Sequence, residues 1–191
     1  MKAKNFTLEA VEWQPWIPPV RAETASPAQR AALDGSPQAN SAYFLTLAND
    51  VDSLAERSPL FHATMYAPGG LKRAERELAT VVVSIINGCV YCSSVHARRF
   101  VELTKRPEVI RALYEQGLDT PLEPRLRAIV DYAAKLTREP AAMRVADLAP
   151  LREVGMDDLE IHDLTNAVAM FANANRLMQT LGEPVLPEGE A

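Results

Sequence analysis

The feature that most constrains this chain is a short segment with both of its cysteines and one of its three histidines: Cys89, Cys92 and His96. These residues are three and four positions apart, so they share one face if the segment is helical. The apolar residues Phe100 and Leu103 continue that face, which predicts that it points into protein. The chain must therefore fold so that one helix presents two thiols and an imidazole to the interior.

The residues before and after this segment also follow helical spacing. A helix is predicted over residues 71–86, because good helix formers lead without a turn residue into the β-branched run that begins at Thr80. Asn87-Gly88 then predicts a C-cap. The next helix begins at Cys89 and ends before Pro107.

Further helices are predicted over residues 41–66 with a break near residues 49–50, and over residues 107–117, 123–137, 143–153 and 157–181. No segment alternates as a strand does, so the predicted fold class is all-α, a multi-helix bundle. Gly70-Leu71 followed by Glu75 is echoed by Gly155-Met156 followed by Glu160. This echo is consistent with a duplicated helical unit.

The first forty residues lack this regularity, because prolines and glycines interrupt every short pattern. We therefore predict an N-terminal arm over residues 1–40 and a helical domain over residues 41–191. Trp13, Trp16 and Ile17 need cover, which the helical body or a neighbouring subunit would supply. A mobile tail is the alternative.

The composition limits the partners and the cellular setting. A chain of 191 residues fits one domain, and its 20 basic and 25 acidic residues give a net charge of −5. No basic run supports a nucleic-acid partner. The N-terminal segment lacks the apolar core of a signal peptide, and the apolar stretch at residues 78–86 is too short to span a membrane. We expect a soluble, cytoplasmic protein with no nucleic-acid or membrane partner.

In a reducing compartment, a bridge between cysteines only three positions apart points to redox chemistry rather than to a structural staple. A helix N-terminus favours thiolates, and His96 can take the Cys92 proton directly or through one water. Glu77 on the preceding helix would orient His96 or exchange protons with it.

Reduction of a hydroperoxide needs an attacking thiolate, a proton for the leaving alkoxide and a second thiol. Cys92 with His96 meets the first two needs. Cys89, expected to be more exposed at the helix start, meets the third.

The motif resembles that of a known family. Glu77 is followed, after eleven residues, by Cys89-Val90-Tyr91-Cys92 and then, after three more residues, by His96. This spacing resembles that of alkylhydroperoxidase D and the related carboxymuconolactone decarboxylase-like proteins. Looser similarity over residues 41–182 resembles their peroxidase-related branch. The resemblance implies an all-α bundle of the alkylhydroperoxidase D-like type and a homo-oligomer (dimer, trimer or hexamer).

The resemblance also implies roles for the motif residues. Cys92 would be the peroxidatic thiol, Cys89 the resolving thiol, and Glu77 with His96 the proton relay. The substrate would be a hydroperoxide. The reductant would be an external dithiol that the sequence does not identify; a lipoyl protein, a small dithiol and a thioredoxin-like partner all stay open. Alkylhydroperoxidase D has a histidine where this chain has Tyr91, an auxiliary residue that can donate a hydrogen bond but does not titrate near neutrality.

Other interpretations remain open at this point. The dithiol fits carboxymuconolactone decarboxylation less well than redox work, but it also fits a thiol–disulfide oxidoreductase or a non-enzymatic redox sensor. Zinc bound by the four motif residues is a further alternative, although the spacing is unlike that of paired zinc knuckles, and we predict no metal or cofactor. Glu77 is alternatively a solvated charge on its helix. Asn173, Asn175 and Arg176 are predicted to have a buried hydrogen-bonding or interface role.

Overall fold

The computed structural model describes residues 6–34, 36 and 38–187. The elements in order are β1 (Glu12–Pro15), α1 (Pro27–Leu33), α2 (Ala42–Leu47), α3 (Val51–Tyr66), α4 (Arg73–Asn87), α5 (Val90–Thr104), α6 (Pro107–Gln116), α7 (Pro124–Arg138), α8 (Ala149–Glu153), α9 (Asp158–Thr180) and β2 (Gly182–Val185). The predicted all-α class is confirmed, with one small two-stranded sheet in the described part. None of the described helices is long and apolar enough to cross a membrane.

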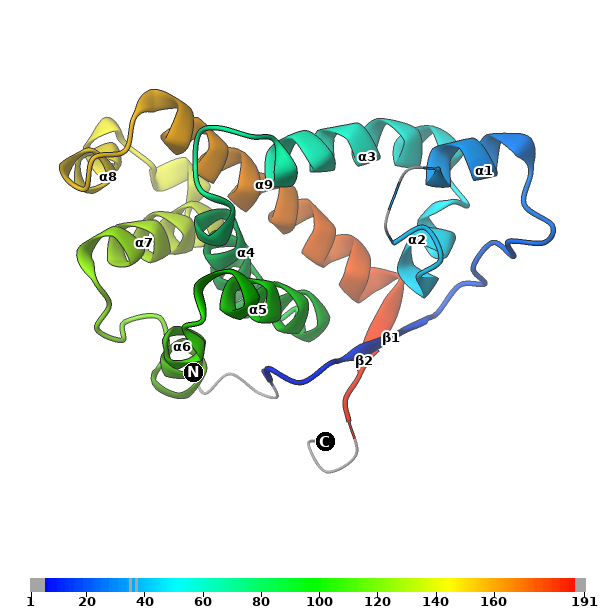
Figure 1. The fold of residues 1–191 in the computed structure, drawn as a ribbon, viewed down its shortest axis with the longest axis horizontal. Helices are drawn as coiled ribbons and strands as arrows, with labels where there is room; N and C mark the ends of the chain where they lie inside the picture. Colours follow the sequence, from blue (N-terminus) through cyan, green and yellow to red (C-terminus); the bar gives the residue numbers. More distant parts are fainter. Residues whose placement is uncertain (1–5, 35, 37, 188–191) are drawn as a thin grey trace.

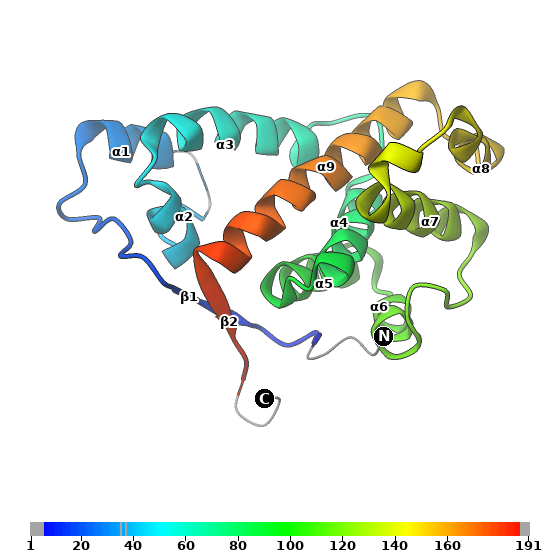
Figure 2. The same ribbon diagram turned by 180° about the vertical axis from the view of Figure 1, so that it is seen from behind.

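Helix α4 lies at the centre of the main core. It packs against α5, α7 and α9, which surround it in Figures 1 and 2. Residues 75–84 of α4 are all buried, so this helix is enclosed on every side. Full enclosure explains why a β-branched run, which alone resembles a strand, is stable in a helix here.

The turn between α4 and α5 follows the prediction. Helix α4 ends at Asn87, and Gly88 is its C-cap with φ +73°. A glycine takes this left-handed conformation without the steric cost that a side chain would add. The chain then reverses directly into α5, so that the end of one helix and the start of the next form one tight corner.

The strands β1 and β2 come from opposite ends of the chain and were not predicted. They pair antiparallel, with Trp13 opposite Pro184, and lie beside the C-terminal end of α9 in both ribbon views. A Cβ on Gly182 would lie 2.3 Å from the Trp13 ring, so only glycine allows this approach. Trp13 is buried, and its Nε1–H donates to the Met178 carbonyl at 3.0 Å. Pro15 at the end of β1 and Pro184 within β2 have no N–H to donate, which keeps the ladder short.

The predicted arm therefore packs on the helical body over much of its described length. Of the three apolar side chains predicted to be buried against other parts of the protein, Trp13 is buried, whereas Trp16 and Ile17 are 58% and 42% exposed. The arm also contains α1, which was not predicted and which packs beside α3. Residues 1–5, Gly35 and Pro37 of the arm lie outside the described residues, as do residues 188–191 of the predicted domain.

Two further predictions were wrong. The helix predicted over residues 143–153 is a 3₁₀ turn over Val145–Leu148 followed by the short α8, because Pro150 lacks the N–H that a continuous helix needs. The apolar face of α5 does not extend to Leu103. Phe100 is buried, but Leu103 is 53% exposed because it lies in the last turn, beyond the packed part of the helix.

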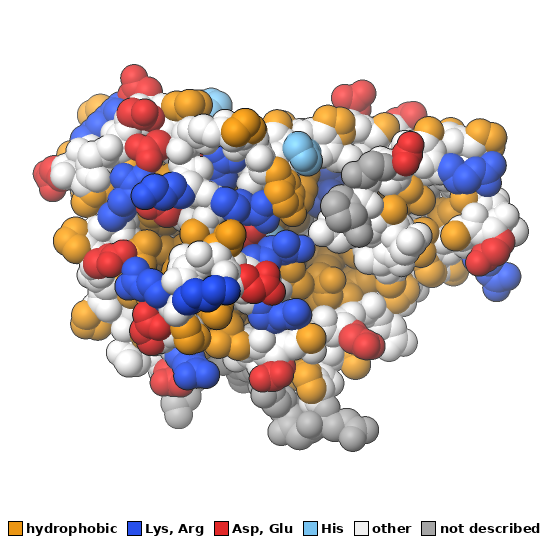
Figure 3. Space-filling view, viewed as in Figure 1, with side chains coloured by type: hydrophobic (Ala, Val, Ile, Leu, Met, Phe, Trp, Pro, Cys, Tyr) orange, Lys and Arg blue, Asp and Glu red, His pale blue; other side chains and the backbone are white. Residues whose placement is uncertain are grey.

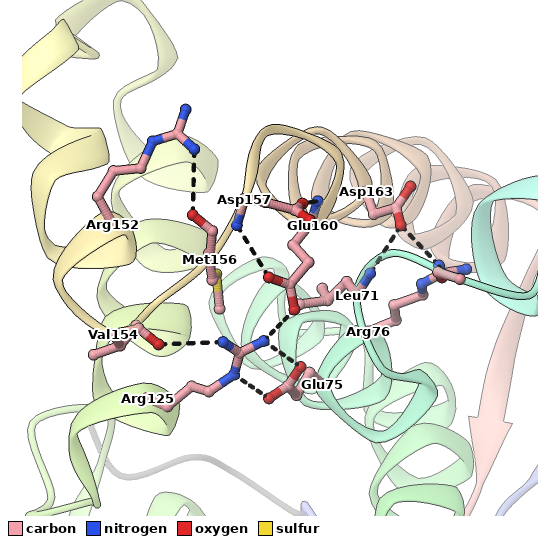
Figure 4. A network of polar contacts seen from close by, with 11 residues as sticks. Leu71, Glu75, Arg76, Arg125, Arg152, Val154, Met156, Asp157, Glu160 and Asp163 are labelled. Atoms are coloured by element: carbon pink, nitrogen blue, oxygen red, sulfur yellow. Dashed lines mark hydrogen bonds and ion pairs between the residues drawn. The ribbon is translucent and has the colours of Figure 1, made fainter.

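The two echoed segments meet at the start of α4 and α9. Glu75 and Glu160 occupy equivalent positions and both accept hydrogen bonds from one guanidinium, that of Arg125 on α7 (Figure 4). Beside them, Asp163 of α9 accepts from the Leu71 backbone at 3.0 Å and from Arg76 at 2.8 Å. These contacts fix the starts of α4 and α9 against each other, and thereby the frame that carries the motif helix.

Candidate active site

The two cysteines lie at the start of α5. Cys89 is the N-cap of this helix, and Cys92 is in its first turn. The backbone N–H of Cys89 donates to the Ser84 carbonyl at 2.9 Å, which links the cap to the end of α4. Both cysteines are free thiols and both are buried, with 2% of Cys89 and 4% of Cys92 exposed. The prediction that Cys89 is the more exposed thiol was wrong, because the arm and α9 cover the helix start.

The two thiols are hydrogen-bonded to each other. The Cys92 thiol donates to the Cys89 sulfur, and this hydrogen bond lowers the pKa of Cys89. The backbone N–H of Cys92 lowers it further, while burial opposes the shift. Donation to Cys89, together with burial, raises the pKa of Cys92 well above its usual value. The reduced pair therefore loses its first proton easily and its second with difficulty, as coupled groups do.

Glu77 and His96 come together as the motif predicts. The Nδ1 of His96 is hydrogen-bonded to Glu77 Oε2, and Glu77 is fully buried. Arg73, one turn earlier on α4, donates to Glu77 Oε1 through Nε at 2.6 Å. Burial alone would raise the pKa of Glu77, but the His96 and Arg73 charges outweigh it and lower the pKa. Glu77 is thus not a solvated helix-face charge; it is a buried carboxylate that orients an imidazole.

Asn175 of α9 completes the corner between α4 and α5. It is fully buried, donates to Ser84 Oγ at 3.1 Å and accepts from Asn87 Nδ2 at 3.1 Å. Its side chain also hydrogen-bonds to both thiols and lowers the pKa of each. The predicted buried hydrogen-bonding role of Asn175 is present, whereas Asn173 and Arg176 are exposed. Sequence reasoning missed the thiol contact and the Arg73 pair; the four-residue spacing of Arg73 and Glu77 was the available signal.

A cavity of about 340 Å³ lies against one side of the thiol pair. Cys92, His96 and Tyr91 all line it, and the edge of the imidazole packs on the Phe171 ring at 4.4 Å between centroids. His96 is not among the main groups that shift either thiol pKa. A proton would therefore pass between His96 and Cys92 through a molecule in this cavity.

Cys89 lies on a different surface. It lines a smaller pocket of about 190 Å³ together with Trp13, Trp16 and residues of β2. Trp13 and Cys89 also belong to one apolar cluster with Cys92 and Met178. Tyr91 lines both pockets, and burial raises its pKa, so it is a neutral hydrogen-bond donor near neutral pH. The two thiols thus meet each other inside the protein but face outward in different directions.

The described side chains of the site do not form a metal-binding set. Among the described residues, no group of three or more histidine, cysteine, aspartate or glutamate side chains is arranged to hold a metal ion. The zinc alternative required Cys89, Cys92, His96 and Glu77 to converge. In the structure Glu77 is instead engaged by Arg73 and His96, away from the thiol pair.

Residues 54–135, which include α4, α5 and the whole motif, match the model of the carboxymuconolactone decarboxylase family. The resemblance predicted from the motif is confirmed. None of the curated proteins matches this chain.

Solved structures of two peroxidase-related proteins are similar to the whole chain. One, from Ralstonia eutropha JMP134, has an alkylhydroperoxidase AhpD core; it is 29% identical with a TM-score of 0.77, over 87% of this chain and 90% of that chain. The other, from Silicibacter sp. TM1040, is 28% identical with a TM-score of 0.73, over 90% and 94%. The debrominase Bmp8 is 15% identical with a TM-score of 0.68, over 87% and 90%, which supports the fold alone.

Proposed function

We propose that this protein is a thiol-dependent peroxidase that reduces organic hydroperoxides with Cys92 and Cys89. The observation that carries the proposal is a pair of free thiols in hydrogen-bonding contact, one of which lines a cavity together with a carboxylate-oriented histidine. The peroxidase-related relatives and the family match support an enzyme of this general kind.

The proposed reaction starts at Cys92, the thiol that faces the larger cavity. Cys89 is first deprotonated, as its lowered pKa favours; the Cys92 proton then moves to the Cys89 thiolate along their hydrogen bond and leaves Cys92 as the thiolate. The thiolate attacks the terminal oxygen of the hydroperoxide, the O–O bond breaks, and the alkoxide leaves as an alcohol after it takes a proton delivered from the side of His96. Glu77 holds the imidazole in position and balances its charge.

The second half of the reaction restores the thiols. The Cys92 sulfenic acid condenses with the Cys89 thiol, which releases water and forms the disulfide. One helical turn between the two residues already brings their sulfurs into hydrogen-bonding contact. An external dithiol then reduces the bridge by two exchange steps and is itself oxidised to a disulfide.

Rapid mixing of the reduced protein with hydrogen peroxide and with cumene hydroperoxide tests the proposal, with thiol loss and the disulfide followed by mass spectrometry. We expect fast formation of the bridge in the natural protein. Cys89→Ser should stop at a sulfenic acid on Cys92 that dimedone traps, and Cys92→Ser should lose fast oxidation. Fast oxidation retained by Cys92→Ser but lost by Cys89→Ser would reverse the two roles. Oxidation no faster than that of a free cysteine would reject the peroxidase and favour thiol–disulfide exchange.

A further inference from the structure

The larger cavity contains polar groups that the proposed reaction does not use. Besides Cys92 and His96, Tyr43 of α2 and Arg57 of α3 line it. Figure 3 shows hydrophobic side chains at the floor of a hollow between α3 and α5, with basic side chains around it. The charged residues of the lining are three arginines and one glutamate (Arg57, Arg98, Arg99 and Glu102), so the cavity has an excess of positive charge.

The hydrogen-bond donors of Tyr43 and Arg57 are buried and unused. The Tyr43 hydroxyl and the Nε and Nη1 nitrogens of Arg57 have no hydrogen bond of normal length and angle in the described part of the chain. The weak contact by which Arg57 lowers the pKa of Tyr43 can only supply a donor, so the Tyr43 proton still has no acceptor. A buried donor without a partner loses its bonds to water and gains nothing in return, which is why such groups are rare in folded proteins. Two of them side by side in a cavity indicate that the missing acceptor comes from a bound molecule.

Aromatic rings hold the Arg57 guanidinium in place. Its Cζ lies 5.0 Å from the ring centroid of Phe61, 5.4 Å from that of Phe44 and 5.7 Å from that of Tyr43. Cation–π attraction to these faces offsets part of the cost of removing the charge from water. The edges of the guanidinium, where its N–H groups point, are left free for an acceptor.

We propose that Arg57 and Tyr43 bind the carboxylate of a small organic acid whose apolar part lies against the aromatic lining of the cavity. The fork of N–H donors on a guanidinium matches the two oxygens of a carboxylate. Burial raises the pKa of Tyr43 to about 12, so its hydroxyl keeps the proton that it would donate. The carboxylate site itself does not depend on the proposed peroxidase function. Only the further statement, that the substrate is an acid whose hydroperoxide group points to Cys92, rests on that function.

A different role for Arg57 must be separated from this one. Its charge lowers the pKa of Cys92, although less than the Cys89 hydrogen bond and burial raise it. If Arg57 acts only by favouring the Cys92 thiolate, its removal slows every hydroperoxide equally. If it binds a carboxylate, its removal slows only substrates that carry one.

The first experiment measures binding without any peroxide group. Calorimetry compares 4-isopropylbenzoate with its methyl ester on the natural protein and on Arg57→Gln, Arg57→Lys and Tyr43→Phe. We expect the acid to bind at least tenfold more tightly than the ester, and Arg57→Gln to weaken the acid about 10- to 100-fold, the range for a charge-assisted hydrogen bond. Arg111→Gln, an exposed residue of α6, is the control with the same change in charge and should change neither ligand. Equal binding of acid and ester would overturn the proposal.

The second experiment measures selectivity in the reaction. The substrates are cumene hydroperoxide with a 4-carboxylate and the methyl ester of the same compound. Arg57→Gln should lower kcat/KM about 10- to 100-fold for the acid and less than about threefold for the ester. An equal loss for both would assign Arg57 to the thiolate and refute the carboxylate site. If neither hydroperoxide reacts but 4-isopropylbenzoate binds as expected, the peroxidase fails and the carboxylate site stands.

Discussion

Replacement of Glu77 by glutamine removes one charge from a fully buried position and keeps the shape of the side chain. The carboxylate binds two groups, Arg73 through Oε1 and His96 through Oε2. Removal of one partner from a buried ion pair costs about 3–5 kcal/mol. The Arg73 side chain is 24% exposed and can turn towards water, which offsets part of this cost. We therefore expect Glu77→Gln to lower the free energy of unfolding by about 3 kcal/mol near neutral pH.

The same carboxylate makes a pH-dependent contribution with a defined sign. The pKa of Glu77 is lower in the folded protein than in the unfolded chain, where it is about 4.3. Its contribution is complete above that value and declines as the pH falls towards the folded pKa. At about pH 3.5, below the pKa of the unfolded chain, the contribution is therefore smaller than at neutral pH. The glutamine variant lacks this contribution, so the stability difference between the two proteins should be smaller at about pH 3.5 than at about pH 7.

Urea unfolding followed by circular dichroism at about pH 7 and pH 3.5 measures both quantities. Glu115→Gln on α6 is the matched control, because this glutamate is exposed; its stability should stay within about 0.5 kcal/mol of the natural protein. A Glu77→Gln variant as stable as the natural protein at neutral pH would refute the claim that the carboxylate holds Arg73 and His96. A difference that is the same at both pH values would refute the lowered pKa.

Two further predictions concern the surroundings of the thiols. Trp13→Ala should lower the free energy of unfolding, measured in urea, by about 3–5 kcal/mol, because it removes a buried ring and its hydrogen bond to the Met178 carbonyl. Trp16→Ala, at an exposed site, is the control and should change the free energy of unfolding by less than about 1 kcal/mol. Equal effects of the two substitutions would contradict the packing of the arm. Asn175→Ala should shift the pH midpoint of thiol alkylation upward, because Asn175 lowers the pKa of both thiols, and an unchanged midpoint would show that it does not touch the pair.

The helices around the motif were predictable because their signals are local. Residues 71–86 contain good helix formers followed by a β-branched run, and Gly88 marks the end of the helix that they form. A C-cap glycine needs no knowledge of the tertiary structure, because its left-handed conformation is a property of the residue. Pro107 marks the next boundary in the same way, since it stands at the first position of α6.

Helix α1 was missed although its signal is equally local. Ser26-Pro27 was interpreted as a break, but Ser26 is the N-cap of α1. Its hydroxyl accepts a hydrogen bond from the Gln29 backbone N–H, and the Gln29 side-chain oxygen accepts one from the Ser26 backbone N–H. Pro27 then occupies the first helical position, where its missing N–H costs nothing. A proline after a serine and before a glutamine should therefore be taken as the start of a helix.

The strands β1 and β2 could not be predicted from local patterns. Trp13 and Gly182 are brought together only by the path of all nine intervening helices of the described chain. Each strand has four residues and contains a proline, so neither shows the alternation that identifies a strand. The pairing is a consequence of the fold and not a cause of it.

The same distinction applies to the site. Cys89, Cys92 and His96 lie on one helix, so their spacing alone predicted that they would gather. Arg57 and Asn175 reach the thiols from α3 and α9, and nothing in their local sequence connects them to the motif. The residues that sequence spacing reveals, Cys89, Cys92 and His96, are those of the proposed redox chemistry. The residues that only packing brings to the site, Arg57 and Asn175, lower the pKa of Cys92 against the larger effects of the Cys89 hydrogen bond and burial. Arg57 also supplies unpaired donors in the cavity, which is where substrate selection would arise.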